Sequence, residues 1–179
     1  MKSHPILFSA PMVQSLLADR KTQTRRLSES WMKVKSGDEL WVRETFCVCD
    51  GAAYGSGQSD RMALYSATYT GHSGMVWRPC IHMPRWASRI TLRATADARR
   101  ESLQEITEQD AVAEGIMLLG SPKVGEGYGH EEGQHYLFDS ARDAYAELWN
   151  RLHGKDAPWN SNPTVTVVSF EVVAGAGAR

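Results

Sequence analysis

The sequence of 179 residues has few cysteines, no long hydrophobic run and no excess of charge of either sign. Its three cysteines cannot all pair with one another, so no disulfide framework is indicated. The apolar run at residues 6–8 is too short for a signal peptide and is soon followed by Pro11. No stretch has the length and hydrophobicity of a membrane span. We therefore expect a cytoplasmic protein without a membrane partner.

The balance of charge argues against broad binding to duplex nucleic acid, which requires the neutralisation of many phosphates. Lys and Arg total 20 against 21 Asp and Glu, which gives a net charge of −1. The charge is nevertheless uneven along the chain, because residues 20–26 form a basic cluster whereas residues 101–147 are mostly acidic. A local basic patch in a nearly neutral chain favours a small anionic or polar ligand.

The cysteines give little support to a metal site. Cys47 and Cys49 could combine with Cys80 and His82, but this spacing is incomplete beside the C-x2-C pairs of structural zinc sites. Alternate positions on one strand explain the first two cysteines equally well. We expect neither a metal nor an organic cofactor.

Hydrophobic periodicity and turn residues predict a single α+β domain over residues 1–179, with a curled or closed sheet. Short strands are predicted at residues 6–8, 22–27, 39–44, 62–70, 88–96 and 164–173. Helices are predicted over residues 9–18, 107–115 and 140–152, with Asp139 as the cap of the third. Thr107 and Asp110 form a capping-box pattern, and Gly115 marks the end of that helix. Residues 118–136 hold many glycines and no clear period, which predicts a mobile loop or lid.

The first candidate site is the basic segment at the junction between a helix and a strand. Lys21 lies close to Thr24, and a lysine whose pKa is lowered by burial or by neighbouring cations can remove a hydroxyl proton. The two side chains would face opposite ways on one ideal strand, so the hypothesis requires Lys21 to lie in the turn before the strand. A solvated basic edge strand is the alternative.

Two carboxylates are also candidates. Glu114 lies near the C-terminal end of the second predicted helix, where a negative charge is disfavoured by about 0.3–1 kcal/mol relative to a cation. It either has a role in a site or is an exposed residue that tolerates this cost. Glu44 shares a register with Leu40 and Val42 and would need a buried partner, for which Arg26 is suitable. A salt bridge and a ligand anchor are equally good interpretations of Glu44.

The segment 77–89 interleaves aromatic residues with arginines. Aromatic faces and guanidinium planes can stack on nucleobases, so Arg85 and Trp86 are candidate ligand contacts. Cover for the hydrophobic core is the alternative explanation for the tryptophans. A hydrogen-bonded structural role suits His82 better than general-base catalysis.

Several blocks, in order along nearly the whole chain, resemble the ASCH-domain family, in particular its phage and prophage versions. They are Ile6-Leu-Phe-Ser-Ala-Pro-Met, Leu17-Ala-Asp-Arg-Lys-Thr-Gln-Thr-Arg-Arg, Gly37-Asp-x-Leu-Trp-Val-Arg-Glu44, Ile81–Ile90, Ile106–Gly115 and Asn162–Phe170. The resemblance implies a PUA-like mixed β-barrel surrounded by short helices, with a cleft for RNA or nucleoside-like ligands.

Compact bacterial members of that family are amidohydrolases that remove the acetyl group from N4-acetylcytidine. In those proteins a Lys-Thr-x-Thr-x-Arg stretch supplies the catalytic lysine and the second threonine. Lys21, Thr24 and Arg26 match this pattern, and Glu114 matches a glutamate of the family. The resemblance thus implies that Thr24 attacks the amide carbonyl with Lys21 as base, while Glu114 orients Lys21 or water.

The chain departs from the compact amidohydrolases in three places. It has an insertion at about residues 46–80 and the Gly-rich loop at about 118–136, and Asp19 stands where a glycine is usual. These differences could adapt the pocket to another acyl group or base.

Three functions therefore compete. An amidohydrolase acting on N4-acylated cytidine is favoured, with Lys21, Thr24 and Glu114 as catalytic residues. Substrate contacts are expected at Arg26, Glu44, Arg85 and Trp86. An RNA-binding module without catalysis and a metal-independent ribonuclease are the alternatives, so single-stranded RNA is a second candidate partner. We expect a monomer.

Overall fold

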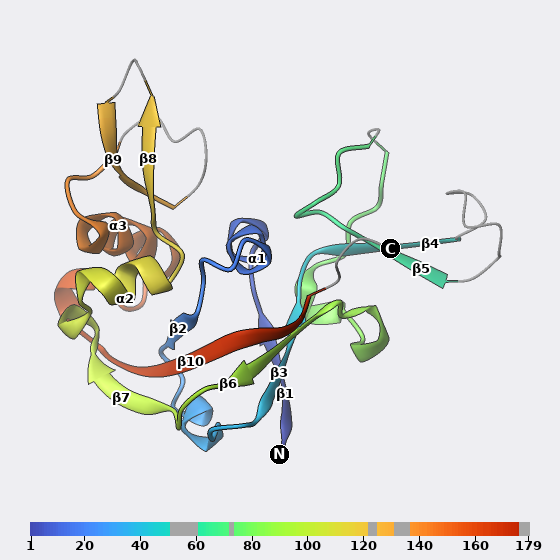
Figure 1. Ribbon diagram of the computed structural model, residues 1–179, viewed down its shortest axis with the longest axis horizontal. Helices are drawn as coiled ribbons and strands as arrows, with labels where there is room; N and C mark the ends of the chain where they lie inside the picture. Colours follow the sequence, from blue (N-terminus) through green and yellow to red (C-terminus); the bar gives the residue numbers. More distant parts are fainter. Residues whose placement is uncertain (51–60, 72–73, 122–124, 131–136, 176–179) are drawn as a thin grey trace.

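A curved mixed sheet forms the centre of the computed structural model, which describes residues 1–50, 61–71, 74–121, 125–130 and 137–175 (Figure 1). Its strands are β1 (Ser3–Leu7), β2 (Gln23–Arg26), β3 (Glu39–Arg43), β6 (Ile90–Ala94), β7 (Arg99–Ser102) and β10 (Thr164–Gly175). They run in the order β1-β3-β6-β10-β2, and β7 also pairs with β10. The pairing of β1 with β3 is parallel, and the other pairings are antiparallel.

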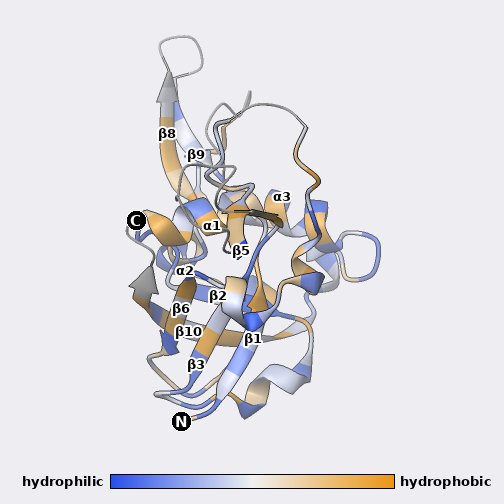
Figure 2. Ribbon diagram, turned by 90° about the vertical axis from the view of Figure 1, so that its right-hand side faces the viewer, coloured by the Kyte–Doolittle hydropathy of each residue, from blue (hydrophilic) through white to orange (hydrophobic). Residues whose placement is uncertain are grey.

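Strand β10 joins the two parts of the sheet, because its first half pairs with β2 and β7 and its second half with β6. Its side chains alternate between two hydrophobic clusters. Val165 and Val167 belong to one cluster, and Val168 and Phe170 belong to the other. In Figure 2 hydrophobic and hydrophilic segments likewise alternate along the strands of this sheet. The α+β prediction is confirmed, and most predicted strands are present within a few residues.

Three α-helices cover the sheet: α1 (Ala10–Leu17), α2 (Glu108–Ala113) and α3 (Ala141–His153). Helix α1 packs in the cluster with Val168, whereas α2 and α3 pack in the cluster with Val165. The capping box of α2 is confirmed, since Thr107 accepts a bond from the Asp110 N–H and the Asp110 carboxylate accepts one from the Thr107 N–H. The predicted cap of α3 is wrong: Ser140, not Asp139, caps this helix and accepts from the Asp143 N–H at 3.0 Å.

Two hairpins project from this core. Strands β4 (Phe46–Asp50) and β5 (Arg61–Tyr65) form one, and β8 (Met117–Ser121) and β9 (Gly125–Gly129) form the other. The prediction of a structureless lid at 118–136 is therefore wrong over its described part. Backbone hydrogen bonds hold β8 to β9, and such a ladder needs no side-chain period in strands rich in glycine. Residues 131–136, and most of the surface loop predicted at 50–60, lie outside the described residues.

Short 3-10 helices complete the described structure: η1 (Glu29–Lys33), η3 (Cys80–His82), η4 (Arg85–Ala87), η5 (Leu103–Glu105) and η6 (Trp159–Ser161). Within the described residues, none of the helices has both the length and the apolar character needed to cross a membrane.

Candidate functional site

Lys21 lies in the turn between α1 and β2, as the hypothesis of an activated lysine requires. Helix α1 ends in a Schellman motif: the Arg20 N–H donates to the Ser15 carbonyl at 2.9 Å, and the Asp19 N–H donates to the Leu16 carbonyl at 3.0 Å. Asp19 takes the left-handed conformation, with φ of 54°, at the position that usually favours glycine. The Schellman motif is thus present although the left-handed position holds an aspartate. The turn that follows directs Lys21 into the protein.

The side chain of Lys21 is buried, with 1% of its surface exposed, and it is bound to Glu114. Its Nζ donates to a Glu114 carboxylate oxygen at 2.8 Å and to the Glu114 carbonyl at 2.6 Å. Glu114 follows α2 directly and is itself 5% exposed. The sequence-based alternative of an exposed glutamate is therefore wrong for this residue.

Close packing brings the end of α2 to Lys21. Gly115 has φ of +105°, a conformation that side chains other than glycine rarely adopt. A Cβ atom there would lie 3.2 Å from Ser15 Oγ and 3.7 Å from Lys21 Cβ. Glycine thus allows α2 to end directly against the turn that carries Lys21.

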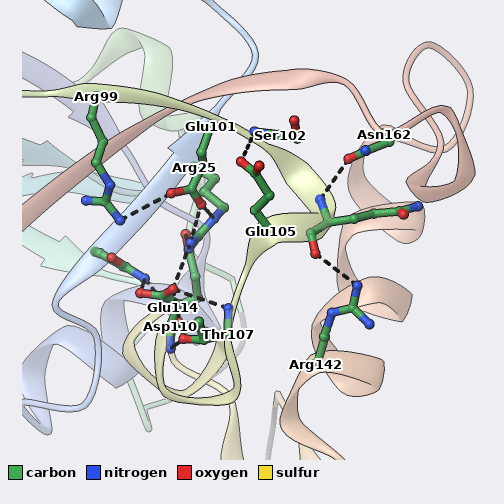
Figure 3. A network of polar contacts seen from close by, with 12 residues as sticks. Arg25, Arg99, Glu101, Ser102, Glu105, Thr107, Asp110, Glu114, Arg142 and Asn162 are labelled. Atoms are coloured by element: carbon green, nitrogen blue, oxygen red, sulfur yellow. Dashed lines mark hydrogen bonds and ion pairs between the residues drawn. The ribbon is translucent and has the colours of Figure 1, made fainter.

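Arg25 holds Glu114 from the other side (Figure 3). Its Nη1 lies 3.2 Å from Glu114 Oε1, and its Nε and Nη2 lie 2.8 and 2.5 Å from Glu101 Oε1. Asp110 is a third, more distant carboxylate at 3.5 Å. Strands β2 and β7 flank β10, so Arg25 reaches across β10 to meet Glu101. The Glu114 carboxylate is fixed between the buried amine of Lys21 and the buried guanidinium of Arg25.

Burial lowers the pKa of Lys21 below its ordinary value of 10.5. The Glu114 carboxylate acts in the opposite direction, while the positive charges of Arg26 and Arg25 lower the pKa further. Burial, aided by these arginines, therefore makes the neutral amine more accessible than in a free lysine, and this is the form that can accept a proton.

Thr24 lines a small cavity of about 40 Å³ beside this cluster. The cavity wall is shared with Arg25, Arg26, Glu114 and Tyr145. Among the described residues, none forms a hydrogen bond with the Thr24 hydroxyl, and Lys21 Nζ is bound to Glu114 instead. The structure thus brings Lys21, Thr24, Arg26 and Glu114 to one region, and Thr24, Arg26 and Glu114 line the cavity there.

A second cavity of about 160 Å³ adjoins the first, since Glu114, Met12 and Leu148 line both. His130, at the end of β9, is 6% exposed and lies on the wall of this larger cavity. Its Nδ1 is 3.9 Å from the Glu147 carboxylate of α3. Both cavities thus lie against Glu114, and residues of α1 and α3 contribute to the walls of both.

Arg26 has a partly structural environment. Its Nη2 donates to the Leu7 carbonyl at 2.8 Å, and its guanidinium lies over the Phe8 ring, 5.3 Å from the centroid. Burial lowers the pKa of Arg26, although Glu114 and Tyr145 oppose this. The guanidinium still borders the Thr24 cavity.

The partner predicted for Glu44 is wrong. Glu44 is buried, at 2% exposed, but it forms a bidentate pair with Arg89 rather than Arg26, with distances of 2.8 and 2.9 Å. Arg26 lies across the sheet, in β2, whereas Arg89 directly precedes β6, which pairs with β3. Glu44 lines neither of the two cavities, and its geometry is that of a structural salt bridge.

Arg85 and Trp86 also lie away from the Lys21 cluster. Arg85 is exposed, with its guanidinium 5.7 Å from the centroid of the Trp41 ring. Trp86 is 50% exposed and lines a separate pocket. Neither residue lines the cavities that Glu114 borders.

Cys47 and Cys49 lie at alternate positions on β4, and among the described residues neither they nor Cys80 form a disulfide. Over the part of the chain that the structure describes, no group of three or more His, Cys, Asp or Glu side chains is arranged to hold a metal ion.

Two site residues were missed from the sequence. Tyr145 was assigned only to the apolar stripe of α3, yet it is buried beside Thr24, and burial together with Glu114 raises its pKa well above the ordinary value. The helical period placed it correctly on the inner face but gave no sign that this face also borders a polar cavity. His130 lay in the glycine-rich stretch, where no pattern indicated its position.

Neither a protein-family model nor a curated protein sequence matches the chain. Among solved structures, the chain superposes on the crystal structure of protein EF3133 from Enterococcus faecalis V583, of the family DUF984. The two are 14% identical, and the match covers 97% of this chain and 77% of the other, with a TM-score of 0.45. At this level of similarity the function has to be argued from the site itself.

Proposed function

We propose that the protein is an amidohydrolase that removes the acyl group from N4-acylated cytidine, with Thr24 as nucleophile and Lys21 as its base. The observation that carries the proposal is the buried Lys21, whose pKa is lowered and whose Nζ is bound to Glu114, a residue that lines one cavity together with Thr24. The family resemblance of the same residues supplies the substrate class. The curved mixed sheet with its short helices is compatible with the PUA-like barrel of that family.

In the first step Thr24 Oγ1 bonds to the acyl carbon and gives its proton to neutral Lys21 Nζ, directly or through one water. The bond between the acyl carbon and N4 then breaks, and the Lys21 ammonium returns the proton to N4 as cytidine leaves. Because Lys21 Nζ is bound to Glu114, the amine has to turn toward Thr24 for direct transfer.

In the second step water attacks the acyl carbon of the acyl-threonine ester and gives a proton to Lys21 Nζ. The bond between the acyl carbon and Thr24 Oγ1 then breaks, the Lys21 ammonium returns the proton to Oγ1, and the carboxylic acid is released. Glu114 would hold Lys21 in position through both steps, and Arg26 would attract the developing negative charge on the acyl oxygen. No step needs a group beyond these side chains and water.

The test is to incubate the purified protein with N4-acetylcytidine and to follow the release of cytidine and acetate. Turnover by the wild type that disappears in Lys21→Ala is the expected result, with circular dichroism showing that the variant is folded. A folded wild-type protein that releases no cytidine would exclude this substrate. Binding of single-stranded RNA without turnover would then favour the non-catalytic module.

A further inference from the structure

A third pocket, apart from the two cavities at Glu114, lies between the β4–β5 hairpin and the segment that contains η3 and η4. Its volume is about 230 Å³. Phe46 and Val48 contribute apolar surface, and the other side chains used below are Arg61, Arg78, His82 and Trp86. It shares no lining residue with the cavities at Glu114. In Figure 1 this hairpin lies at the opposite end of the long axis from α2 and α3.

The backbone around this pocket is firmly held. Phe46 and Arg78 exchange two backbone hydrogen bonds, of 3.2 and 2.7 Å. Met83 and Ala87 are buried against Phe46, and the Tyr65 hydroxyl donates to the Ala87 carbonyl at 3.0 Å. The pocket side chains therefore project from a preorganised frame, which reduces the entropy lost when a ligand binds.

Within the part of the chain that the structure describes, the positive charges of this pocket have no ionic partner. Among the described residues, no ion pair or hydrogen bond engages the guanidinium of Arg61 or Arg78, and no side chain lining the pocket is acidic. Arg89, by contrast, is paired with the Glu44 carboxylate. Two guanidinium groups beside one hollow repel each other, and an anion bound between them would relieve that repulsion. Arginine binds phosphate in a bidentate way, which makes phosphate the best-matched anion.

An aromatic surface accompanies the positive charge. Trp86 exposes half of its surface, and a nucleobase can stack on an exposed indole face. We propose that this pocket binds a phosphorylated nucleotide, with Arg61 and Arg78 on the phosphate, His82 as an additional N–H donor, and the base stacked on Trp86. The ligand is either a free nucleotide or one nucleotide of a single strand, because both present the same phosphate and base. The assignment does not depend on the deacylation chemistry at Lys21.

The test measures binding to the full chain by calorimetry. The probes are cytidine 5′-monophosphate, cytidine, inorganic phosphate and a 5′-phosphorylated RNA hexamer. The double variant Arg61→Gln/Arg78→Gln is expected to bind both phosphorylated probes at least about tenfold more weakly, with cytidine binding unchanged. Trp86→Ala is expected to lose about tenfold for the nucleotide while inorganic phosphate binds as before. The double variant Arg93→Gln/Arg100→Gln, which removes equal charge from exposed positions, is the matched control.

The same titrations distinguish a free nucleotide from one nucleotide of a single strand. Hexamer affinity at least tenfold above that of the monophosphate supports a strand, whereas equal affinities support a free nucleotide. Wild-type protein that binds neither, or an Arg61/Arg78 variant that binds like the Arg93/Arg100 control, would overturn the assignment. The Lys21→Ala variant is expected to bind the hexamer with the affinity of the wild type. The binding result can therefore be interpreted even if the protein does not deacylate N4-acetylcytidine.

Discussion

Lys21 donates two hydrogen bonds to Glu114, one to its carboxylate and one to its backbone carbonyl. The second bond ties the amine to the end of α2 itself, so the position of Lys21 does not depend on the rotamer of Glu114 alone. A residue from the turn after α1 is thereby fixed to a helix from the second half of the chain. The predictions below follow from this pairing and from its surroundings.

The rate of deacylation is expected to rise with pH as Lys21 loses its proton, because the protonated amine cannot accept the proton of Thr24. Burial lowers the pKa of Lys21, so the rise is expected below pH 10.5. In Glu114→Gln the carboxylate that raises this pKa is removed, and the rise is expected to move to lower pH. The pH profile of kcat/KM measures the shift.

Glu29→Gln is the control for that profile, since Glu29 is exposed, pairs with Arg100 and lines neither of the cavities at Glu114. If the rise of kcat/KM in Glu114→Gln occurs at the same pH as in the wild type, or at higher pH, Lys21 is not the titrating base.

Thr24→Ala is expected to lower kcat by about a thousandfold or more, because it removes the nucleophile. Thr22→Ala is the matched control: Thr22 lies two positions away on the same segment but is exposed, and its described contacts are made by the backbone. Mass spectrometry after rapid quenching is expected to find the acyl group on Thr24 in the wild type. Equal activity of the two alanine variants would exclude Thr24 as the nucleophile.

Arg25→Met is expected to destabilise the protein by about 3–5 kcal/mol, because it removes the buried cation shared by the buried Glu114 and the partly buried Glu101. Arg93→Met provides the comparison, since Arg93 and Glu171 form an exposed pair at 3.9 Å, for which a loss of about 0–1 kcal/mol is expected. Urea denaturation measures both changes. Similar losses in the two variants would show that the Arg25 network contributes no more than a surface pair.

Asp19→Gly is expected to stabilise the protein by about 0.5–1 kcal/mol, because Asp19 has φ of 54° and glycine adopts this conformation without steric cost. Asp19→Ala is expected to destabilise it, since alanine has no local hydrogen bond to favour the left-handed state. Thermal unfolding of the two variants tests the order. A glycine variant less stable than the alanine variant would show that another contact of Asp19 determines this turn.

Much of the fold was predictable from local signals. The alternation in 164–173 marked β10, and the Thr107–Asp110 pattern marked the start of α2. Such signals depend on residues close in sequence. The β8–β9 hairpin carried none, because glycine-rich strands pair through the backbone and present no periodic side chains.

The site was only partly predictable. Lys21, Thr24 and Arg26 lie in one segment, so their spacing could be examined directly, and the requirement that Lys21 precede the strand is met. The sequence did not reveal which side chains from distant parts of the chain form salt bridges with each other. Glu44 needed a cation, but the choice of Arg89 over Arg26 depends on which strands are neighbours.

Strand β10 holds the Lys21 turn from the far end of the chain, since the Phe170 N–H donates to the Thr22 carbonyl at 2.8 Å. Its pairings with β2, β6 and β7 are among the most non-local in the protein, and such contacts form late in folding. Until β10 has docked, the Lys21 turn lacks this hydrogen bond and β2 lacks its partner strand. If Lys21 and Thr24 act as proposed above, a nascent chain that has not yet extruded residues 164–175 is expected to be inactive. Hydrolytic activity would then appear only when the sheet is complete.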